Sequence, residues 1–257
     1  MRLNSILQFQ LDSPVIGAKR VCAGVLPDSD GYAGLFREYT HGGPTELWRV
    51  RFDAAGRQTW HERTGISAED PRIFRWNGKL MALAWDYPPH SRPDWQHLLI
   101  DADEGMIQAI LRMENRGDFR GKNWTPVVGG KDLLIIRSLD PLWVMKPDLE
   151  TGRCIDLVAN RGEIGPYRGG SLGTIKGDYI HGFGHKTESA DVHTVFAYAV
   201  DMNNWTVRFD PVIMPDGFNA GVNDPIAAWD GHVVCCSTPR TWAENDWVQH
   251  HLMSVGD

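Results

Sequence analysis

Glu69, Asp70 and Arg72 place two carboxylates and a guanidinium around Pro71, directly ahead of the apolar segment RIFRW. A carboxylate beside cations can move a proton next to a bound anion, which is the chemistry of a general acid or base. Residues two apart on an extended strand share a face, so we expect Asp70 and Arg72 to point to the same side. The pattern predicts a site in which Asp70 and Glu69 are the catalytic residues.

Similar polar residues recur at or near the ends of other apolar segments. The basic ones suit phosphate, because Arg makes forked contacts and Lys provides a point charge. The candidate phosphate- or nucleotide-binding residues are Arg72, Lys122, Arg168, His185 and Lys186. The candidate substrate-binding residues are Arg37, Asn123, Trp124, Asp224 and Asp246. A structural interpretation stays open for each, since Asp-Pro pairs are common in turns and Asp-Arg pairs often only join neighbouring elements.

Short apolar stretches separated by Gly, Asp, Asn and Pro dominate the chain, as expected of strands and hairpins. Helical periodicity is weak, and the short segment 104–113 is its best candidate. The expected strands include residues 34–40, 47–53, 72–76, 79–85, 97–102, 133–139, 142–148, 179–185 and 194–201. The chain is therefore predicted to be all-β.

A strand–turn–strand pattern repeats along the chain. It occurs at residues 22–38, 72–85, 125–138, 170–185 and 224–238. A further strand pair follows each, giving five units of roughly 45–50 residues, the size of a four-stranded propeller blade. We predict a five-bladed β-propeller that forms a single domain over residues 1–257, because a β-sandwich does not require a repeat of this length. The innermost strands of a propeller line a central channel, so charged residues at their starts would converge there.

Metal and cofactor motifs are weak in this sequence. His181 and His185 lie on one expected strand, where four residues span about 13 Å, too far for both to reach one ion. His250 and His251 are expected to be a solvated pair. The segment GGSLG lacks the Lys and the helix of a phosphate-binding loop, and there is no dinucleotide fingerprint. We therefore predict neither a metal nor a cofactor.

The overall composition excludes several classes of protein. The net charge is −7, which argues against broad binding of nucleic acid. No apolar run reaches about 18 residues, so no membrane span is expected, and the N-terminus lacks the pattern of a signal peptide. The four cysteines form no metal or disulfide pattern, which favours reduced thiols and a cytoplasmic location.

Four segments in order resemble the five-bladed β-propellers related to the β-mannoside phosphorylases and the propeller-type mannosyltransferases. They are EDPRIFRWNGKL, GKNWTPVVGGKDLLIIRSLDPLWVMKPDLETG, RGGSLGTIKGDYIHGFGHKT and HTVFAYAVD, and together they extend over roughly residues 66–210. The resemblance is closest to a branch marked by the EDPR, KNW and RGGS motifs. The chain is short for a phosphorylase of this group, and its first and last units match poorly.

The resemblance implies roles for individual residues. Asp70 would be the general acid, reaching the glycosidic oxygen through a sugar hydroxyl. Arg72, Lys122, Arg168 and His185 would bind phosphate, or the phosphates of a sugar nucleotide in a transferase. The reaction would be an inverting, metal-independent transfer of a mannosyl-like unit.

Two alternatives remain open at this stage. A hydrolase of the same fold would need a second carboxylate about 6.5–9.5 Å from the acid. Glu69, Asp224 or Asp246 could supply it. The other alternative is a non-catalytic propeller that binds a glycan or a protein.

Overall fold

Every regular element among the described residues is a β-strand, which confirms the all-β prediction. The computed structural model describes residues 1–11, 19–39, 45–86, 96–113, 123–160, 162–189, 192–218, 221–237 and 249–256, with the backbone alone for 19–22. Within these ranges, no helix is long and apolar enough to cross a membrane.

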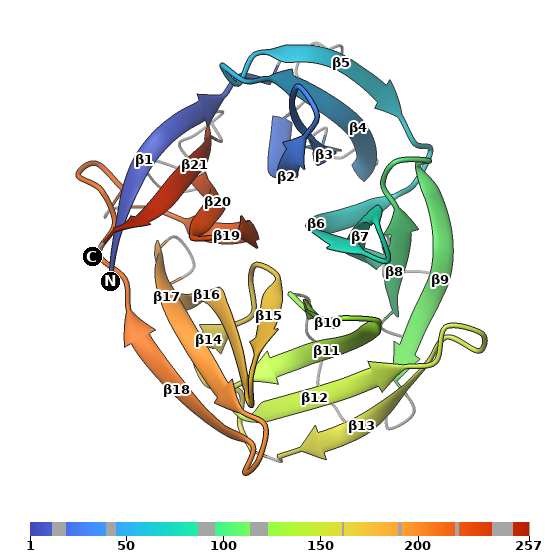
Figure 1. Ribbon diagram of the computed structural model, residues 1–257, viewed down its shortest axis with the longest axis vertical. Coiled ribbons are helices and arrows are strands. Elements are labelled where there is room, and N and C mark those ends of the chain that lie inside the picture. Colours follow the sequence, from blue (N-terminus) through green and yellow to red (C-terminus); the bar gives the residue numbers. More distant parts are fainter. Residues whose placement is uncertain are drawn as a thin grey trace.

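Two separate four-stranded sheets contain the beginning and the end of the chain. The first follows chain order and comprises β2 (Lys19–Asp28), β3 (Gly31–Tyr39), β4 (Thr45–Asp53) and β5 (Gln58–Arg63). The second has the order β1-β21-β20-β19 and comprises β1 (Arg2–Phe9), β19 (Asn223–Trp229), β20 (His232–Ser237) and β21 (Gln249–Gly256). The N-terminal strand therefore completes a sheet made by the C-terminal strands, and Figure 1 shows the two termini side by side.

The strands between these two sheets form one longer sheet that contains three antiparallel meanders. The first meander is β6 (Ala68–Trp76), β7 (Lys79–Asp86), β8 (Gln96–Asp101) and β9 (Met106–Met113). The second is β10 (Thr125–Gly129), β11 (Asp132–Leu139), β12 (Leu142–Pro147) and β13 (Arg153–Ala159). The third is β15 (Gly173–Lys176), β16 (Tyr179–Ser189), β17 (Val192–Asp201) and β18 (Thr206–Pro211), with β14 (Tyr167–Arg168) paired to β16. Short parallel pairs, β9 with β13 and β10 with β15, join the meanders, so the pairing alone does not divide the chain into five separate sheets.

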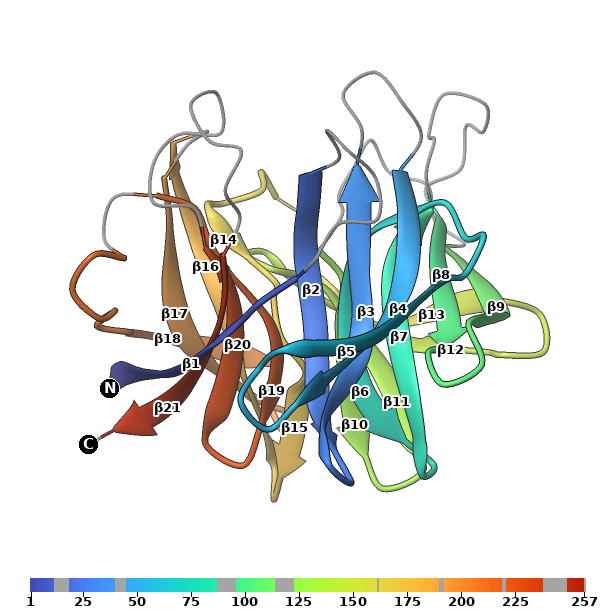
Figure 2. The same ribbon diagram turned by 90° about the horizontal axis from the view of Figure 1, so that it is seen from above.

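The meanders are arranged in a ring around a central axis (Figure 1). Strands β2, β6, β10, β15 and β19 lie nearest the centre, and β1, β5, β9, β13 and β18 lie at the rim. Figure 2 shows the strands from the side, with the inner strands running roughly along the axis. The starts of β6 and β19, where the charged residues lie, are therefore brought close to the same axis.

Inner strands from different sheets pack tightly at Gly24 on β2. A Cβ atom at this position would lie 2.5 Å from Cγ1 of Ile73 on β6 and 3.1 Å from Cγ2 of Ile226 on β19. Glycine is needed here because the neighbouring strands leave no room for a side chain. This apolar contact fixes β2, β6 and β19 relative to one another below the charged strand starts.

The weak helical candidate is wrong, because its residues form the rim strand β9. Met106–Met113 pairs with β8 along its length, and its buried residues alternate, with Ala109 and Leu111 inside and Gln108 and Arg112 exposed. A period of two is the signature of a strand. A short apolar run is compatible with either a helix or a strand in the sequence alone, and here the pairing with β8 makes it a strand.

The expectation that His250 and His251 form a solvated pair is also wrong. Both lie on β21, between β20 and β1, and they are 1% and 7% exposed. His251 Nε2 lies 3.0 Å from the Gln249 Oε1 atom, and its ring packs edge-on against Phe218 at 4.8 Å. Burial, with a smaller effect of His250, lowers the pKa of His251 from 6.5 to about 4.

This burial predicts a loss of stability in mild acid. The unfolded chain takes up a proton on His251 below pH 6.5, whereas the folded chain resists it down to about pH 4. The contribution is therefore fully present above pH 6.5 and is lost as the pH falls from 6.5 to 4. In urea unfolding measured across this range, His251→Gln should remove about 1–3 kcal/mol of the pH-dependent loss. His181→Gln, at an exposed histidine, should leave the pH dependence unchanged; an equal effect of both substitutions would contradict the prediction.

Candidate functional site

Asp70 lies in a β-bulge at the start of the inner strand β6. The pairing of β6 with β7 shifts between Glu69, which is opposite Trp85, and Arg72, which is opposite Leu83. Asp70 has a φ of +52°, a left-handed conformation that non-glycine residues seldom adopt. The regular alternation of a strand therefore does not hold between Asp70 and Arg72, so their spacing alone does not place them on one face.

Arg37 on the neighbouring strand β3 holds both carboxylates of this bulge. Its Nη2 atom lies 2.5 Å from Glu69 Oε1, and its Nη1 atom lies 3.4 Å from Asp70 Oδ1. Its Nε atom donates to the Thr45 hydroxyl at 3.1 Å. Glu69 and Asp70 are only 7% and 8% exposed. The structure thus brings together three residues of the predicted site, with Arg37 bound to the two predicted catalytic carboxylates.

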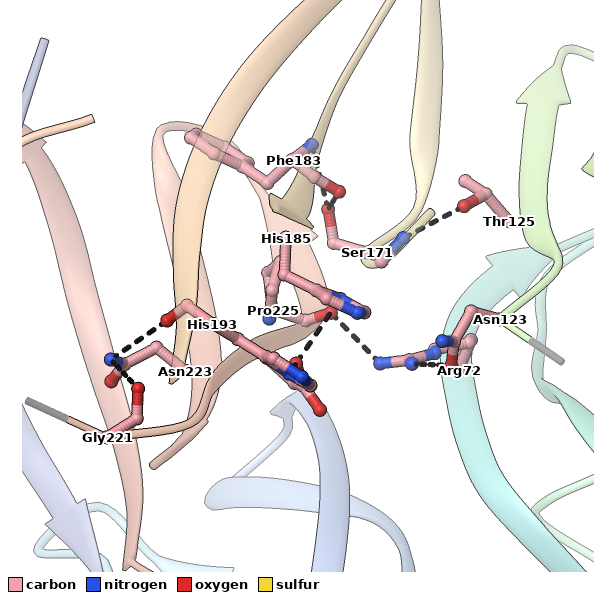
Figure 3. Close-up of polar contacts among 12 residues, drawn as sticks. Arg72, Asn123, Thr125, Ser171, Phe183, His185, His193, Gly221, Asn223 and Pro225 are labelled. Atoms are coloured by element: carbon pink, nitrogen blue, oxygen red, sulfur yellow. Dashed lines mark hydrogen bonds and ion pairs between the residues drawn. The ribbon is translucent and has the colours of Figure 1, made fainter. Parts of the chain in front are cut away.

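Arg72 is buried at 1% exposure and joins three parts of the ring. Its Nη1 atom donates to the Pro225 carbonyl on β19 at 3.0 Å, and its Nη2 atom donates to Asn123 Oδ1 at 2.8 Å (Figure 3). Asn123 itself has a φ of +71°, just ahead of β10. Two of the phosphate-binding and substrate-binding candidates are therefore bonded to each other, and Arg72 acts as a tie between the strand starts.

Trp124 does not offer a face for stacking on a sugar. It is 1% exposed, and its ring stacks on that of His97 with centroids 3.9 Å apart and planes 9° apart. Burial, assisted by Arg72, keeps the pKa of His97 well below its usual value, so this buried ring is neutral. The contact of His97 with Trp124 was not predictable from local sequence, because His97 lies within the buried strand β8.

A second cluster lies where β16, β17 and β19 meet. His193 Nδ1 makes a hydrogen bond of 2.9 Å with Asp224 Oδ1, and His185 Nδ1 lies 3.2 Å from the same oxygen. The two imidazole rings are stacked, with centroids 4.7 Å apart (Figure 3). His185 and Asp224 were candidates from the sequence, whereas His193 was not.

The pKa values of Asp224 and His185 are both lowered in this cluster, for different reasons. Burial alone would raise the pKa of Asp224, but His185, His193 and Arg72 together outweigh it and lower the pKa to about 2. Burial lowers the pKa of His185 to about 4, against the opposing effect of Asp224. Asp224 is therefore ionised and His185 is neutral near pH 7.

The pairing of β16 with β17 explains why His193 joins His185. His185 lies opposite Val195, and Thr187 lies opposite His193, so the two histidines are diagonal neighbours. Diagonal residues on one face of an antiparallel pair lie close enough for ring contact. The segment HKTESADVH has the pattern of a hairpin with one histidine on each strand, and this pattern could have indicated the contact between the two histidines.

The remaining basic candidates that the structure describes have partners within the protein. Arg168 donates to the carbonyl of Gly165, and burial lowers its pKa. Lys186 is adjacent to His185 on β16, so its side chain points to the opposite face, where it pairs with Glu188 at 2.8 Å. Lys122 and Asp246 lie outside the described residues.

These contacts define a site with acidic groups on two sides of a buried cation. Glu69 and Asp70 lie at the start of β6, Asp224 lies at the start of β19, and Arg72 hydrogen-bonds the residue after Asp224. Carboxylates in such a position can take up or release a proton. The arrangement is compatible with acid–base chemistry beside a buried cation.

Comparison with solved structures shows what the fold is similar to. A β-1,2-mannobiose phosphorylase from Listeria innocua, solved with β-1,2-mannobiose, matches with a TM-score of 0.67 at 10% identity, covering 99% of this chain and 97% of that chain. A hypothetical protein from Leishmania major matches with a TM-score of 0.62 at 10% identity, covering 98% of this chain and 91% of that chain. The catalytic domain of a GH62 α-L-arabinofuranosidase from Coprinopsis cinerea matches with a TM-score of 0.59 at 8% identity, covering 98% of this chain and 95% of that chain.

No family model matches the chain, and no curated protein matches it. At identities of 8–10%, the similarity to the solved structures concerns the fold alone. This chain therefore shares the propeller-like, all-β fold of proteins that include carbohydrate-active enzymes.

Proposed function

We propose that this chain is a five-bladed β-propeller, a single domain, and a carbohydrate-active enzyme that transfers a glycosyl unit with inversion. Four of the five blades would be β2–β5, β6–β9, β10–β13 and β15–β18, and the fifth would be the sheet of β19, β20, β21 and β1. Asp70 is the acid/base, and Glu69 supports it. The transferred unit is mannosyl-like, in keeping with the resemblance of the EDPR, KNW and RGGS segments to mannoside enzymes.

The observation that carries this proposal is the strained position of Asp70. A left-handed φ at a non-glycine residue costs about 1–3 kcal/mol and persists only where surrounding contacts enforce it. Here Arg37 and the bulge enforce it at the start of an inner strand, close to the axis of the ring. Strained residues cluster at functional sites, so we place the reacting carboxylate at this strand start, near the centre of the ring.

Phosphate or a sugar nucleotide is the second substrate in the leading form of the proposal. Arg168 and His185 lie opposite each other across β14 and β16, close to Arg72, and would contact the phosphate. Lys122 is a further candidate from the sequence. A phosphate entering there would draw on donors such as Arg72 Nε, which is buried and has no hydrogen-bond partner.

Hydrolysis is a second candidate, and a specific observation favours it. Arg72, Arg168 and Lys186 already bind acceptors of the protein. Water needs no cation, and inverting hydrolysis needs a second carboxylate that activates the water. Asp224 is a suitable base because it stays ionised near pH 7.

Product analysis distinguishes these reactions. The protein is incubated with β-1,2-mannobiose and related mannosides, with and without inorganic phosphate, and with GDP-mannose and an acceptor sugar. Mannose 1-phosphate formed only with phosphate would support phosphorolysis, GDP release would support transfer, and free mannose without phosphate would support hydrolysis. Ligand-induced thermal stabilisation without any turnover would instead support a non-catalytic binding propeller and overturn the enzymatic proposal.

A further inference from the structure

His185, His193 and Asp224 together have the composition of a metal site. Each offers one ligand atom, and these atoms all lie within 4.8 Å of one another. They come from three strands, β16, β17 and β19, which belong to two different sheets. The three side chains therefore meet at the boundary between two sheets.

One nitrogen of the cluster has no hydrogen-bond partner among the described residues. His185 is 2% exposed, and its Nδ1 atom lies 3.2 Å from Asp224 Oδ1 but makes no hydrogen bond within the described part of the chain. The oxygen is already bonded to His193 Nδ1 at 2.9 Å. A buried nitrogen with no hydrogen-bond partner is costly, and an ion bound by both this nitrogen and the carboxylate would satisfy it.

We propose that His185, His193 and Asp224 bind a divalent transition-metal ion, with Zn²⁺ as the representative. Two imidazoles and one carboxylate are a ligand set that transition metals favour over Mg²⁺ or Ca²⁺, which prefer oxygen. In a tetrahedral zinc site with bonds of about 2.1 Å, ligand atoms lie about 3.4 Å apart. The separations of 2.9 and 3.2 Å are close to that spacing, and rotation of the histidine rings would bring the third pair into range.

The neighbouring cation does not block this site. Arg72 lies close enough to affect the pKa of Asp224, but its Nη atoms are directed to the Pro225 carbonyl and to Asn123. The three ligands leave at least one coordination position open, since zinc takes four. The ion would connect the hairpin β16–β17 to β19, close to the carboxylates of the candidate site.

The direct test is metal binding by the full chain, with any affinity tag removed. The protein is treated with a chelator, dialysed against Zn²⁺ or Co²⁺, and its metal content is measured by mass spectrometry. We expect one ion per chain and, for Co²⁺, visible absorption bands of a low-coordinate nitrogen and oxygen site. Mg²⁺ and Ca²⁺ at the same concentration should not compete.

Variants assign the binding to these residues. His193→Ala and Asp224→Asn should each weaken Zn²⁺ binding by more than about 100-fold, because loss of outer-shell partners alone costs 10–100-fold. His181→Ala is the matched control, since this exposed histidine lies on the same strand as His185 and outside the cluster. Circular dichroism checks that each variant is folded. If His193→Ala does not fold, Asp224→Asn alone tests whether the cluster binds the metal.

Two outcomes would overturn the proposal. One is less than about a fifth of an equivalent of Zn²⁺ bound by the wild-type chain at concentrations that saturate ordinary zinc sites. The other is equal binding by the wild type, His193→Ala and Asp224→Asn, which would place the ion elsewhere. The metal content is measured without any sugar, so this result is independent of whether the proposed glycosyl transfer is found.

Discussion

Asp70→Asn is expected to lower the rate of glycosyl transfer by about 10²–10⁴-fold, the usual contribution of a general acid or base. Asparagine has nearly the same size as aspartate and tolerates a left-handed φ at least as well, so the bulge should persist. Arg37 keeps its 2.5 Å contact with Glu69, which should hold it in place. The rate is measured with whichever substrate the product analysis identifies, and ligand binding is followed by thermal shift.

The matched control is Asp210→Asn. Asp210 is also paired with an arginine, Arg208, at 3.2 Å, but it lies on the rim strand β18. We expect this variant to keep full activity. Retention of activity within about threefold by Asp70→Asn would remove Asp70 from the chemistry, since a lost acid should cost at least about 10²-fold. Loss of both turnover and ligand binding would assign Asp70 to substrate binding instead.

Glu69→Gln separates the two carboxylates of the bulge. Glu69 makes the shorter contact with Arg37, at 2.5 Å, whereas Asp70 lies at 3.4 Å. If Glu69 supports Asp70 by holding Arg37, its substitution should lower activity less than Asp70→Asn does. A larger loss of activity in Glu69→Gln than in Asp70→Asn would instead make Glu69 the acid/base and Asp70 the supporting residue.

The strands and their repetition were predictable from local sequence. The repeated strand–turn–strand pattern coincides with the pairs β2–β3, β6–β7, β10–β11, β15–β16 and β19–β20, because turns rich in Gly, Asp and Asn separate strands wherever they occur. The pairing of β1 with β21 was not predictable. It joins residues such as Leu3 and Val255, and no local pattern records a contact between the two ends of a chain.

The sequence indicated some of the residues that gather near the axis, but it did not indicate how they contact one another. The charges at the starts of β6 and β19 do gather near one axis, as a repeated unit requires. The bulge at Asp70 interrupts the regular alternation of the strand, and a bulge depends on the partner strand, which a single segment does not reveal. His193 was missed for a related reason, since it contacts His185 only after the hairpin has formed.

Arg72 is expected to matter for stability as well as for the site. Its guanidinium is buried, and the Pro225 carbonyl and Asn123 Oδ1 both accept hydrogen bonds from it. Arg72→Met removes the charge and both donors while keeping much of the volume. Breaking a buried polar network of this kind costs about 3–5 kcal/mol, and we expect a decrease of that size in the free energy of unfolding. Urea denaturation measures it.

Arg75→Met is the matched control for this measurement. Arg75 lies on the same strand and also donates to a carbonyl, that of Pro27 at 2.6 Å, but its side chain is 46% exposed. Its substitution should cost less than about 1 kcal/mol, as for other exposed pairs. A similar small cost for Arg72→Met would contradict the structural role.

A second substitution at this position, Arg72→Lys, tests whether Arg72 binds phosphate. If Arg72 is mainly a tie between β6, β10 and β19, Arg72→Lys should lose about 1–3 kcal/mol of stability, because an ammonium cannot reproduce two forked hydrogen bonds. If Arg72 is mainly a phosphate ligand, Arg72→Lys should stay stable and instead lose the thermal stabilisation by phosphate or a sugar 1-phosphate. The two measurements on one protein therefore separate a residue that builds the site from a residue that binds the substrate.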